Sequence, residues 1–292
     1  MTTAKNLSEQ VKEIKSAAMS IAAKKRAIVN LGFTKYEADL LTADIVATPR
    51  TRKALFTFGV EIECLVPRNA ITDAARANEL PIQYEGYNHR DNTSYFKFVS
   101  DGSIMGENPI ECVSPVLSSK DGFSKLENAC KCLNIAGAKV NRSTGLHVHI
   151  GAASLTDEHY VSVFQNYKML EAVIDTFMAE SRRASHSRWC ATLKRHDFSY
   201  CHTKSAVRQE LDFDRYHKVN AESYARHKTI EFRQHQGTTD YTKIANWVRF
   251  CAKLVEWSKT NRLTTPVQSI DDIEFLTKAE KTFFKNHATA LA

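Results

Sequence analysis

The sequence predicts an α+β protein in which helices cover one face of an antiparallel sheet. Several segments after residue 50 alternate apolar and polar side chains with a period of two, which is typical of strands with one buried face. Two long segments, 157–180 and 239–259, place apolar residues three and four positions apart, as amphipathic helices do. Such helices can bury the apolar side of a sheet whose other side stays polar.

Composition places the chain among globular proteins. It has 292 residues, of which 43% are hydrophobic and 25% charged. No apolar run approaches the roughly 20 residues that span a bilayer, and the first ten residues lack the apolar region of a secretory signal. Seven cysteines at irregular spacing indicate reduced thiols rather than a disulfide framework. We therefore expect a cytoplasmic protein with no membrane partner.

The N-terminal segment carries most of the net charge. Residues 1–53 contain ten Lys or Arg and five Asp or Glu, whereas the formal charge of the whole chain is +7. The remaining residues are close to neutral, which argues against a protein that binds nucleic acid over its whole surface. The excess charge is compatible with a solvated surface and also with a docking surface for an acidic partner.

Residues 1–50 are predicted to form a helical hairpin. Apolar residues recur at helical spacing over 8–31, and Gly32 then provides a stop signal. Thr34 and Glu37 form a capping box for a second helix that extends to about residue 45. The role of this basic hairpin stays open at this stage.

The polar faces of the predicted strands carry acids, histidines and one arginine. These strands lie within 56–66, 95–104, 109–115, 143–151 and 228–237. Their candidate site residues are Glu61 and Glu63, Asp101 in a turn, Glu111, His147 and His149, and Glu231 and Arg233. A solvated strand face could also carry charges, but such a face usually mixes Lys, Thr, Ser and Gln. The composition therefore favours a functional site.

Convergence of these strands in one curved sheet would bring four glutamates to one arginine. Repulsion would then force protonation of some carboxylates unless cations enter. Oxygen-rich sites with an occasional imidazole suit Mg²⁺ or Mn²⁺ better than zinc. The sequence contains neither GxxxxGK[ST] nor GxGxxG. Metals and basic side chains, rather than a glycine-rich loop, would have to hold the phosphates of any nucleotide.

Four motifs in order resemble the putative amidoligase family, which belongs to the glutamine synthetase and glutamate–cysteine ligase superfamily of carboxylate–amine ligases. They are VEIE, DGS with a following IECVSP, STGLHVHIG, and TIEFRQHQGTTDY. The resemblance covers about residues 55–257. It implies a glutamine synthetase-like half-barrel, a curved antiparallel sheet with helices on its outer face and with ATP and metals on its concave side. The expected parts are a helical extension (1–50), the catalytic domain (51–260) and a helical tail (261–292).

The resemblance also assigns metal ligands. Glu61 and Glu63 would each bind one of two ions, Mg²⁺ or Mn²⁺. Glu111 would share the ion of Glu63. His147 and Glu231 would share the ion of Glu61.

Three further residues acquire expected roles by the same resemblance. His149 is similar to a histidine that lies toward the nucleotide phosphates, and Arg233 to the arginine that steadies the transferring phosphoryl group. Asp101 would contact substrate or metal. Three basic residues in the segment without clear periodicity have no assigned role and could equally hold an anion or lie in a solvated loop: Arg182, Arg188 and Lys204.

The resemblance implies ATP-dependent formation of an amide or peptide bond between a carboxylate and an amine through an acyl phosphate, with release of ADP and phosphate. Two other functions stay open. A divalent-metal-dependent hydrolase or nuclease could use a similar cage of carboxylates and histidines to activate water. A non-enzymatic binding protein could keep the scaffold and dock nucleic acid or a protein through its basic arm.

Overall fold

The computed structural model describes residues 7–17, 21–32, 38, 56–86, 90–184 and 186–291. The chain divides into two compact units, Met1–Ala54 and Leu55–Ala292. Each unit has its own packed elements, and the second contains the whole sheet.

In the part of the first unit that is described, there are two short helices, α1 (Leu7–Ser16) and α2 (Ile21–Asn30). The sequence predicted one continuous helix over 8–31 instead. Two shorter helices can pack on each other, and each then buries an apolar side chain, Val11 and Ile28 respectively. The predicted helix over 34–45 lies outside the described residues, apart from residue 38.

The second unit is built on an eight-stranded open sheet. Seven strands follow the order β2-β3-β4-β1-β6-β8-β7, and the short strand β5 pairs with the first two residues of β1. Every pairing is antiparallel except that of β2 with β3, which is parallel. The strands are β1 (Thr57–Leu65), β2 (Ile82–Glu85), β3 (Phe96–Val99), β4 (Pro109–Val113), β5 (Leu117–Ser118), β6 (Gly145–Gly151), β7 (Val219–Asn220) and β8 (Thr229–Gln236). The predicted α+β class with a mainly antiparallel sheet is confirmed.

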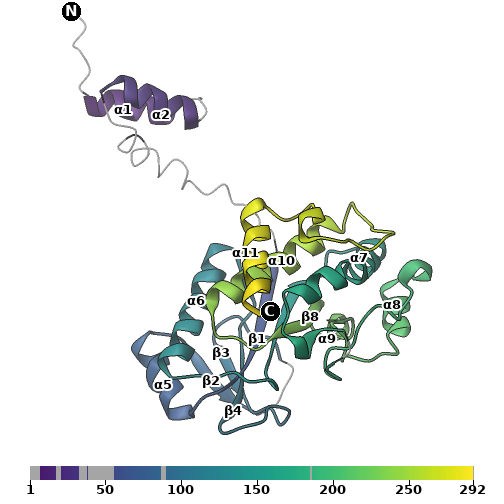
Figure 1. The fold of residues 1–292 in the computed structure, drawn as a ribbon. Coiled ribbons are helices and arrows are strands. Elements are labelled where there is room, and N and C mark those ends of the chain that lie inside the picture. The colour runs from purple at the N-terminus through teal and green to yellow at the C-terminus, as the bar shows by residue number, and fades with distance from the viewer. Residues whose placement is uncertain are drawn as a thin grey trace, which may run out of the picture. The chain divides into compact units, whose positions relative to one another are not determined.

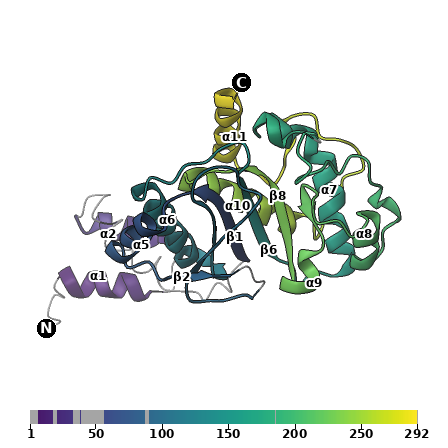
Figure 2. The same ribbon diagram turned by 90° about the horizontal axis from the view of Figure 1, so that it is seen from below.

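Helices cover one face of this sheet (Figures 1 and 2). The helices α6 (Ser119–Ile135), α7 (Asp157–Thr176) and α10 (Tyr241–Trp257) pack on this face. The other helices of the second unit that the structure describes are α5 (Arg68–Ala77), α8 (Lys204–Glu210), α9 (Ser223–His227) and α11 (Lys278–Leu291), with short 3₁₀ turns η1 (Glu180–Arg182), η2 (Phe198–Tyr200) and η3 (Ile270–Asp272). Buried side chains of α6, α7 and α10 join those of the strands in one core, where the ring centroids of Tyr167 and Phe232 are 5.7 Å apart. Burial on this side explains the period-two pattern of the strands.

Capping residues determine where the two long helices begin. The Thr156 side chain accepts a hydrogen bond from the backbone N–H of His159 and begins α7. Asp240 accepts from the N–H groups of Thr242 and Lys243 and begins α10. These bonds satisfy backbone donors that the first turn of a helix leaves unpaired.

An extra residue in β8 forms a β-bulge. Leu146 of β6 lies opposite His235, but Val148, two positions later, lies opposite Phe232. Gln234 lies on the helical side with Ile230 and Phe232, and it accepts a hydrogen bond of 2.5 Å from the Tyr167 hydroxyl. Arg233 stays on the opposite side with Glu231, so this one strand supplies polar groups to both of its faces.

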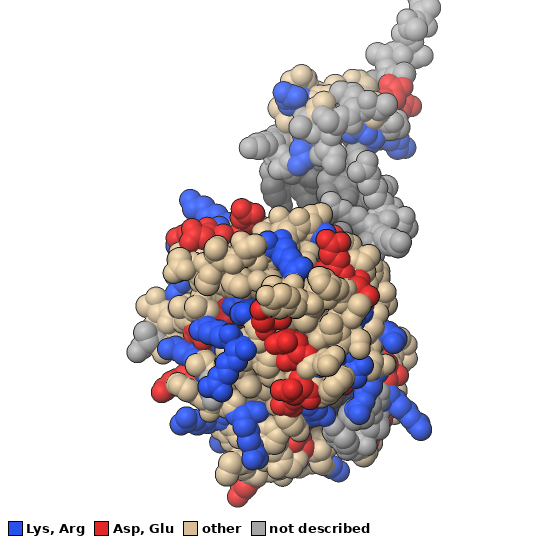
Figure 3. Space-filling model, turned by 90° about the vertical axis from the view of Figure 1, so that its right-hand side faces the viewer, with Lys and Arg blue, Asp and Glu red and all other residues tan. Residues whose placement is uncertain are grey.

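All seven cysteines are buried and none is in a disulfide. Within the described ranges, no helix combines the length and the apolar character that crossing a membrane requires. On the face that Figure 3 shows, acidic side chains gather in a central band with basic side chains on either side.

Candidate active site and metal centre

The polar side of the sheet forms the wall of a cavity of about 990 Å³. The strands β4, β1, β6 and β8 are neighbours, and their registers place Glu63 opposite Glu111, Glu61 opposite His147, and His149 opposite Glu231. All eight candidate residues from the sequence line this cavity: Glu61, Glu63, Asp101, Glu111, His147, His149, Glu231 and Arg233. The structure therefore brings together side chains that are up to 172 residues apart in the chain.

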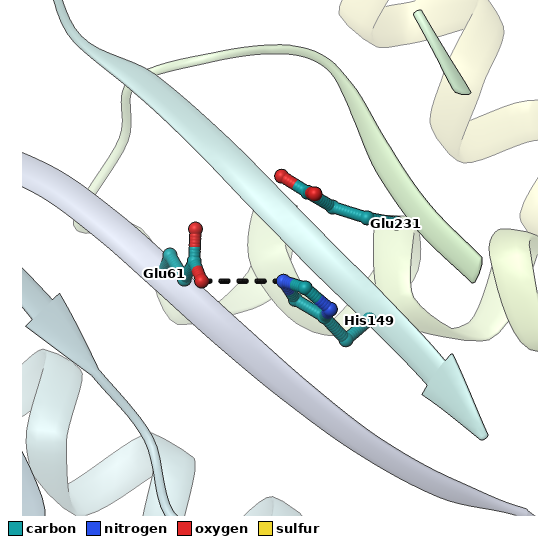
Figure 4. A group of neighbouring side chains, drawn as sticks. All are labelled: Glu61, His149 and Glu231. Atoms are coloured by element: carbon teal, nitrogen blue, oxygen red, sulfur yellow. Dashed lines mark hydrogen bonds and ion pairs between the residues drawn. The ribbon is translucent and has the colours of Figure 1, made fainter. Parts of the chain in front are cut away.

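Glu61 lies between the two histidines. Its Oε2 is 2.9 Å from Nδ1 of His147, and its Oε1 is 3.2 Å from Nε2 of His149. Figure 4 shows Glu61, His149 and Glu231 on three adjacent strands, with the Glu61–His149 contact drawn as a dashed line. Burial raises the pKa of Glu61. The charge of His149 and the hydrogen bonds from both histidines lower it by more than burial raises it, so the net pKa lies well below 4.5.

A second group contains only carboxylates. Ligand oxygens of Glu63, Asp101 and Glu111 lie within 4.8 Å of one another. Oε2 of Glu63 accepts a hydrogen bond of 2.6 Å from the backbone N–H of Gly145. Burial raises the pKa of Glu111 well above 4.5, and the nearby Glu61, Glu63 and Asp101 raise it further. These carboxylates therefore lack enough positive charge to balance them.

The donor chemistry fits divalent cations that prefer oxygen. Three groups of side chains could each hold an ion: Glu61 with His149 and Glu231; Glu61 with Glu111 and His147; and Glu63 with Asp101 and Glu111. The sequence paired Glu63 with Glu111, as the third group does. It also joined Glu61 and Glu231 to His147, whose Nδ1 lies 2.9 Å from Oε2 of Glu61 and 3.6 Å from Oε1 of Glu231. Mainly carboxylate ligands with one imidazole suit Mg²⁺ or Mn²⁺.

Arg233 is fixed beside Glu231. Its Nη1 donates to Oε1 of Glu231 over 2.5 Å, its backbone N–H donates to Lys218 O, and its Nε lies 3.4 Å from Trp189 O. Burial alone would lower the pKa of Arg233, but Glu231 and Glu61 raise it overall, so the guanidinium stays charged. Burial raises the pKa of Glu231, whereas Arg233 and His149 lower it to a net value below 4.5.

Sequence reasoning missed Asn220 and did not place the basic residues. Asn220 lies opposite Glu231 in β7, and its Nδ2 donates to Oε2 of Glu231 over 2.5 Å. Among the three unassigned cations, only Arg182 lines the cavity. The Arg188 guanidinium lies 4.3 Å from the centroid of the Trp189 ring, and Lys204 pairs with Asp157 at 3.0 Å. No short-range pattern marks these positions, because the segment 181–220 consists of turns and very short elements.

The rest of the wall is rich in positive charge. Basic side chains that line the cavity are Arg90, Lys97, Arg182, Arg208, Arg215, Arg226, Lys228 and Arg233. An acidic centre beside many cations can hold both metal ions and the anionic groups that those ions bind.

The comparison with known protein families agrees with the resemblance of the motifs. The sequence profile described as "Putative amidoligase enzyme" matches residues 55–255. A solved structure described as a novel glutamine synthase homolog is similar at 12% sequence identity, with a TM-score of 0.41; the match covers 87% of this chain and 69% of that chain. No curated protein sequence matches the chain.

Proposed function

Because this chain belongs to the putative amidoligase family, we propose that it is an ATP-dependent ligase that joins a carboxylate to an amine. The observation that carries the proposal is the composition of the cavity beside the sheet. Five carboxylates, two histidines and Arg233 meet there from neighbouring strands and the turn after β3. This wall can bind divalent cations, and the surrounding arginines and lysines can bind the phosphates of a nucleotide.

The proposed reaction has two steps. The carboxylate of the acid substrate attacks the γ-phosphorus of ATP, which gives an acyl phosphate and ADP. The amine then attacks the acyl carbon and loses a proton, so that an amide forms and phosphate leaves. No protein nucleophile is required, which agrees with the burial of every cysteine.

The chain's residues take distinct roles in this proposal. Arg233, held in place by Glu231, donates hydrogen bonds to the transferring phosphoryl group. His149 lies toward the nucleotide phosphates, and Asp101 contacts substrate or a metal. Mg²⁺ or Mn²⁺ held by Glu61, Glu63, Glu111, His147 and Glu231 would neutralise phosphate charge.

The proposal is tested by the products. Purified protein is incubated with ATP, Mg²⁺ or Mn²⁺, hydroxylamine and a panel of carboxylic acids, and ADP and hydroxamate are measured. An acyl phosphate predicts equal amounts of ADP and hydroxamate with the correct acid. Formation of AMP and pyrophosphate contradicts the mechanism, and cleavage of a substrate without ATP indicates a metal-dependent hydrolase instead.

A further inference from the structure

Arg182 is a buried cation that faces the cavity without a carboxylate partner. Its residue is only 4% exposed, yet it lines the cavity. Its Nη2 donates to the backbone oxygen of Thr144 over 2.6 Å. Within the described part of the chain, no Asp or Glu forms an ion pair with its guanidinium. A desolvated arginine with one neutral acceptor is poorly compensated in the absence of an anion.

Three buried or partly buried cations of the second unit show the usual arrangement, in which a carboxylate balances the charge. Arg233 pairs with Glu231 at 2.5 Å, and Arg208 makes two hydrogen bonds of 2.7 Å to the Glu222 carboxylate. Lys218, which is fully buried, pairs with Glu171 at 2.9 Å. The lack of such a partner at Arg182 therefore distinguishes it from cations whose role in the fold is evident.

The guanidinium lies at the edge of the candidate metal centre. A Cβ at Gly145 would lie 3.1 and 3.2 Å from the two terminal nitrogens of Arg182, and 3.2 Å from Nε2 of His147. The backbone N–H of the same glycine binds Glu63. Because glycine has no side chain, both the guanidinium and the imidazole remain close to this point beside the carboxylates.

The backbone of Arg182 is held by the side chain of Gln234 in β8. Nε2 of Gln234 donates to the Arg182 backbone oxygen over 3.2 Å and to Oδ1 of Asp175 over 2.6 Å. Gln234 directly follows Arg233 in the chain. This part of β8 therefore supplies Arg233, which is already paired, and also the side chain that holds the backbone of Arg182, which faces the cavity without a carboxylate.

We propose that Arg182 binds a carboxylate of the acid substrate. The planar guanidinium can donate two parallel hydrogen bonds to a carboxylate. Its place next to Glu63 and His147 would hold the acid at the metal centre. The substrate class rests on the proposed function, whereas the binding of a carboxylate by Arg182 can be measured without any turnover.

The test uses acetate as the probe. The Tm of the full chain is measured in excess Mg²⁺, once with sodium acetate and once with sodium chloride at the same ionic strength. At about tenfold excess over the dissociation constant, acetate should raise the Tm by about 3 °C. Acetamide, which has a similar shape without the charge, should have no such effect. Arg182→Gln should abolish the acetate response and Arg182→Lys should weaken it.

The matched control is Arg183→Gln, because Arg183 is the next residue in the chain but does not line the cavity, and its Nε donates to Met178 O. Arg183→Gln should keep the acetate response. An equal response in wild type and Arg182→Gln, or no response in wild type, overturns the inference. If Arg182→Gln does not fold, the comparison of Arg182→Lys with wild type decides.

A second arm measures the binding of ADP with Mg²⁺ by calorimetry. Arg182→Lys and Arg182→Gln should leave the ADP dissociation constant within about twofold of the wild-type value. If Arg182 contacted phosphate, removing that charged contact would raise the constant by about tenfold or more. A loss of ADP affinity as large as the loss of the acetate response would show that Arg182 contacts phosphate instead. Failure of the ligase assay with an intact acetate response would contradict the proposed function and leave the binding role of Arg182 standing.

Discussion

Glu63 and Glu111 lie directly opposite each other on β1 and β4, and both line the cavity. Like charges at facing positions of an antiparallel pair destabilise a sheet. Burial adds to the effect, because water cannot screen the two carboxylates. The metal-free protein therefore contains an unfavourable interaction at the centre of its sheet.

Replacing Glu111 with Gln should stabilise the metal-free protein. The raised pKa of Glu111 means that the folded state holds its proton more tightly than the unfolded state does. Its contribution to stability therefore increases as the pH falls through the raised folded pKa toward 4.5. In EDTA above that pKa, Glu111→Gln should unfold with a free energy larger by about 1–2 kcal/mol and should lose this pH dependence. Denaturant unfolding over a pH series measures both effects, and a variant less stable than wild type contradicts them.

Replacing Glu61 or Glu231 with Gln should abolish ATP turnover and leave the fold intact. Either change removes a charged ligand from the groups that could hold an ion. We expect the Mn²⁺ dissociation constant to rise more than about tenfold, as measured by calorimetry. Glu222→Gln is the control, because Glu222 lines the cavity but belongs to none of those groups. Unchanged Mn²⁺ affinity in both Glu61→Gln and Glu231→Gln would rule out their ligand roles.

Replacing Arg233 with Ala should slow ADP release by about 10³-fold or more, which is the effect of a charge-stabilising arginine on phosphoryl transfer. Nucleotide affinity should fall much less, because most phosphate contacts would come from metals. Single-turnover kinetics and nucleotide titration separate the two effects. Arg76→Gln, on an exposed part of α5, should change neither. An equal loss in affinity and rate would assign Arg233 to ground-state binding.

Replacing Gln234 with Leu should lower the free energy of unfolding by about 2 kcal/mol, because buried partners of the amide lose their hydrogen bonds. Gln234 is fully buried and bonds to Tyr167, Asp175 and the Arg182 backbone. The acetate response assigned to Arg182 should also weaken, since its backbone is no longer held. Gln209→Leu, at an exposed position of α8, should change neither quantity. A variant as stable as wild type would contradict the importance of this network.

Removing residues 1–54 should leave a folded protein that still releases ADP, because the sheet and every candidate site residue lie in the second unit. We propose that the basic first unit docks an acidic partner or substrate. Turnover of the physiological substrate should then fall while ADP release with a small acid persists. Circular dichroism checks the fold. Insolubility of residues 55–292 would make the first unit a part of the structural core.

Much of the sheet and site could be predicted because their signals are local. The faces of β1, β6 and β8 differ in burial, so Glu61 and Glu63, or His147 and His149, appear two positions apart in the sequence. The parallel pairing of β2 with β3 has no such signal, because it depends on how the intervening chain folds back.

Asn220 and Arg182 illustrate the other limit of sequence analysis. Asn220 lies in a strand of two residues, and Arg182 in a single 3₁₀ turn. Elements this short show no periodicity. Their positions come from contacts with β8, such as the bond between Gln234 and the Arg182 backbone oxygen, and a single sequence does not reveal such contacts.

The strand order also has a consequence for folding kinetics. β1 is the first strand in the chain but lies inside the sheet, between β4 and β6. Glu61 contacts His147, 86 residues later, and Glu231 is supplied by the last strand. A nascent chain emerging from the ribosome therefore cannot assemble this wall until β8 has been synthesised. Pairings at such sequence separation are slow to form, with refolding expected in about milliseconds to seconds for sheet-rich domains. Until β8 docks, β6 would expose an unpaired edge that other chains can pair with. Chaperone binding and aggregation during translation should therefore depend most on how quickly residues 229–236 are synthesised.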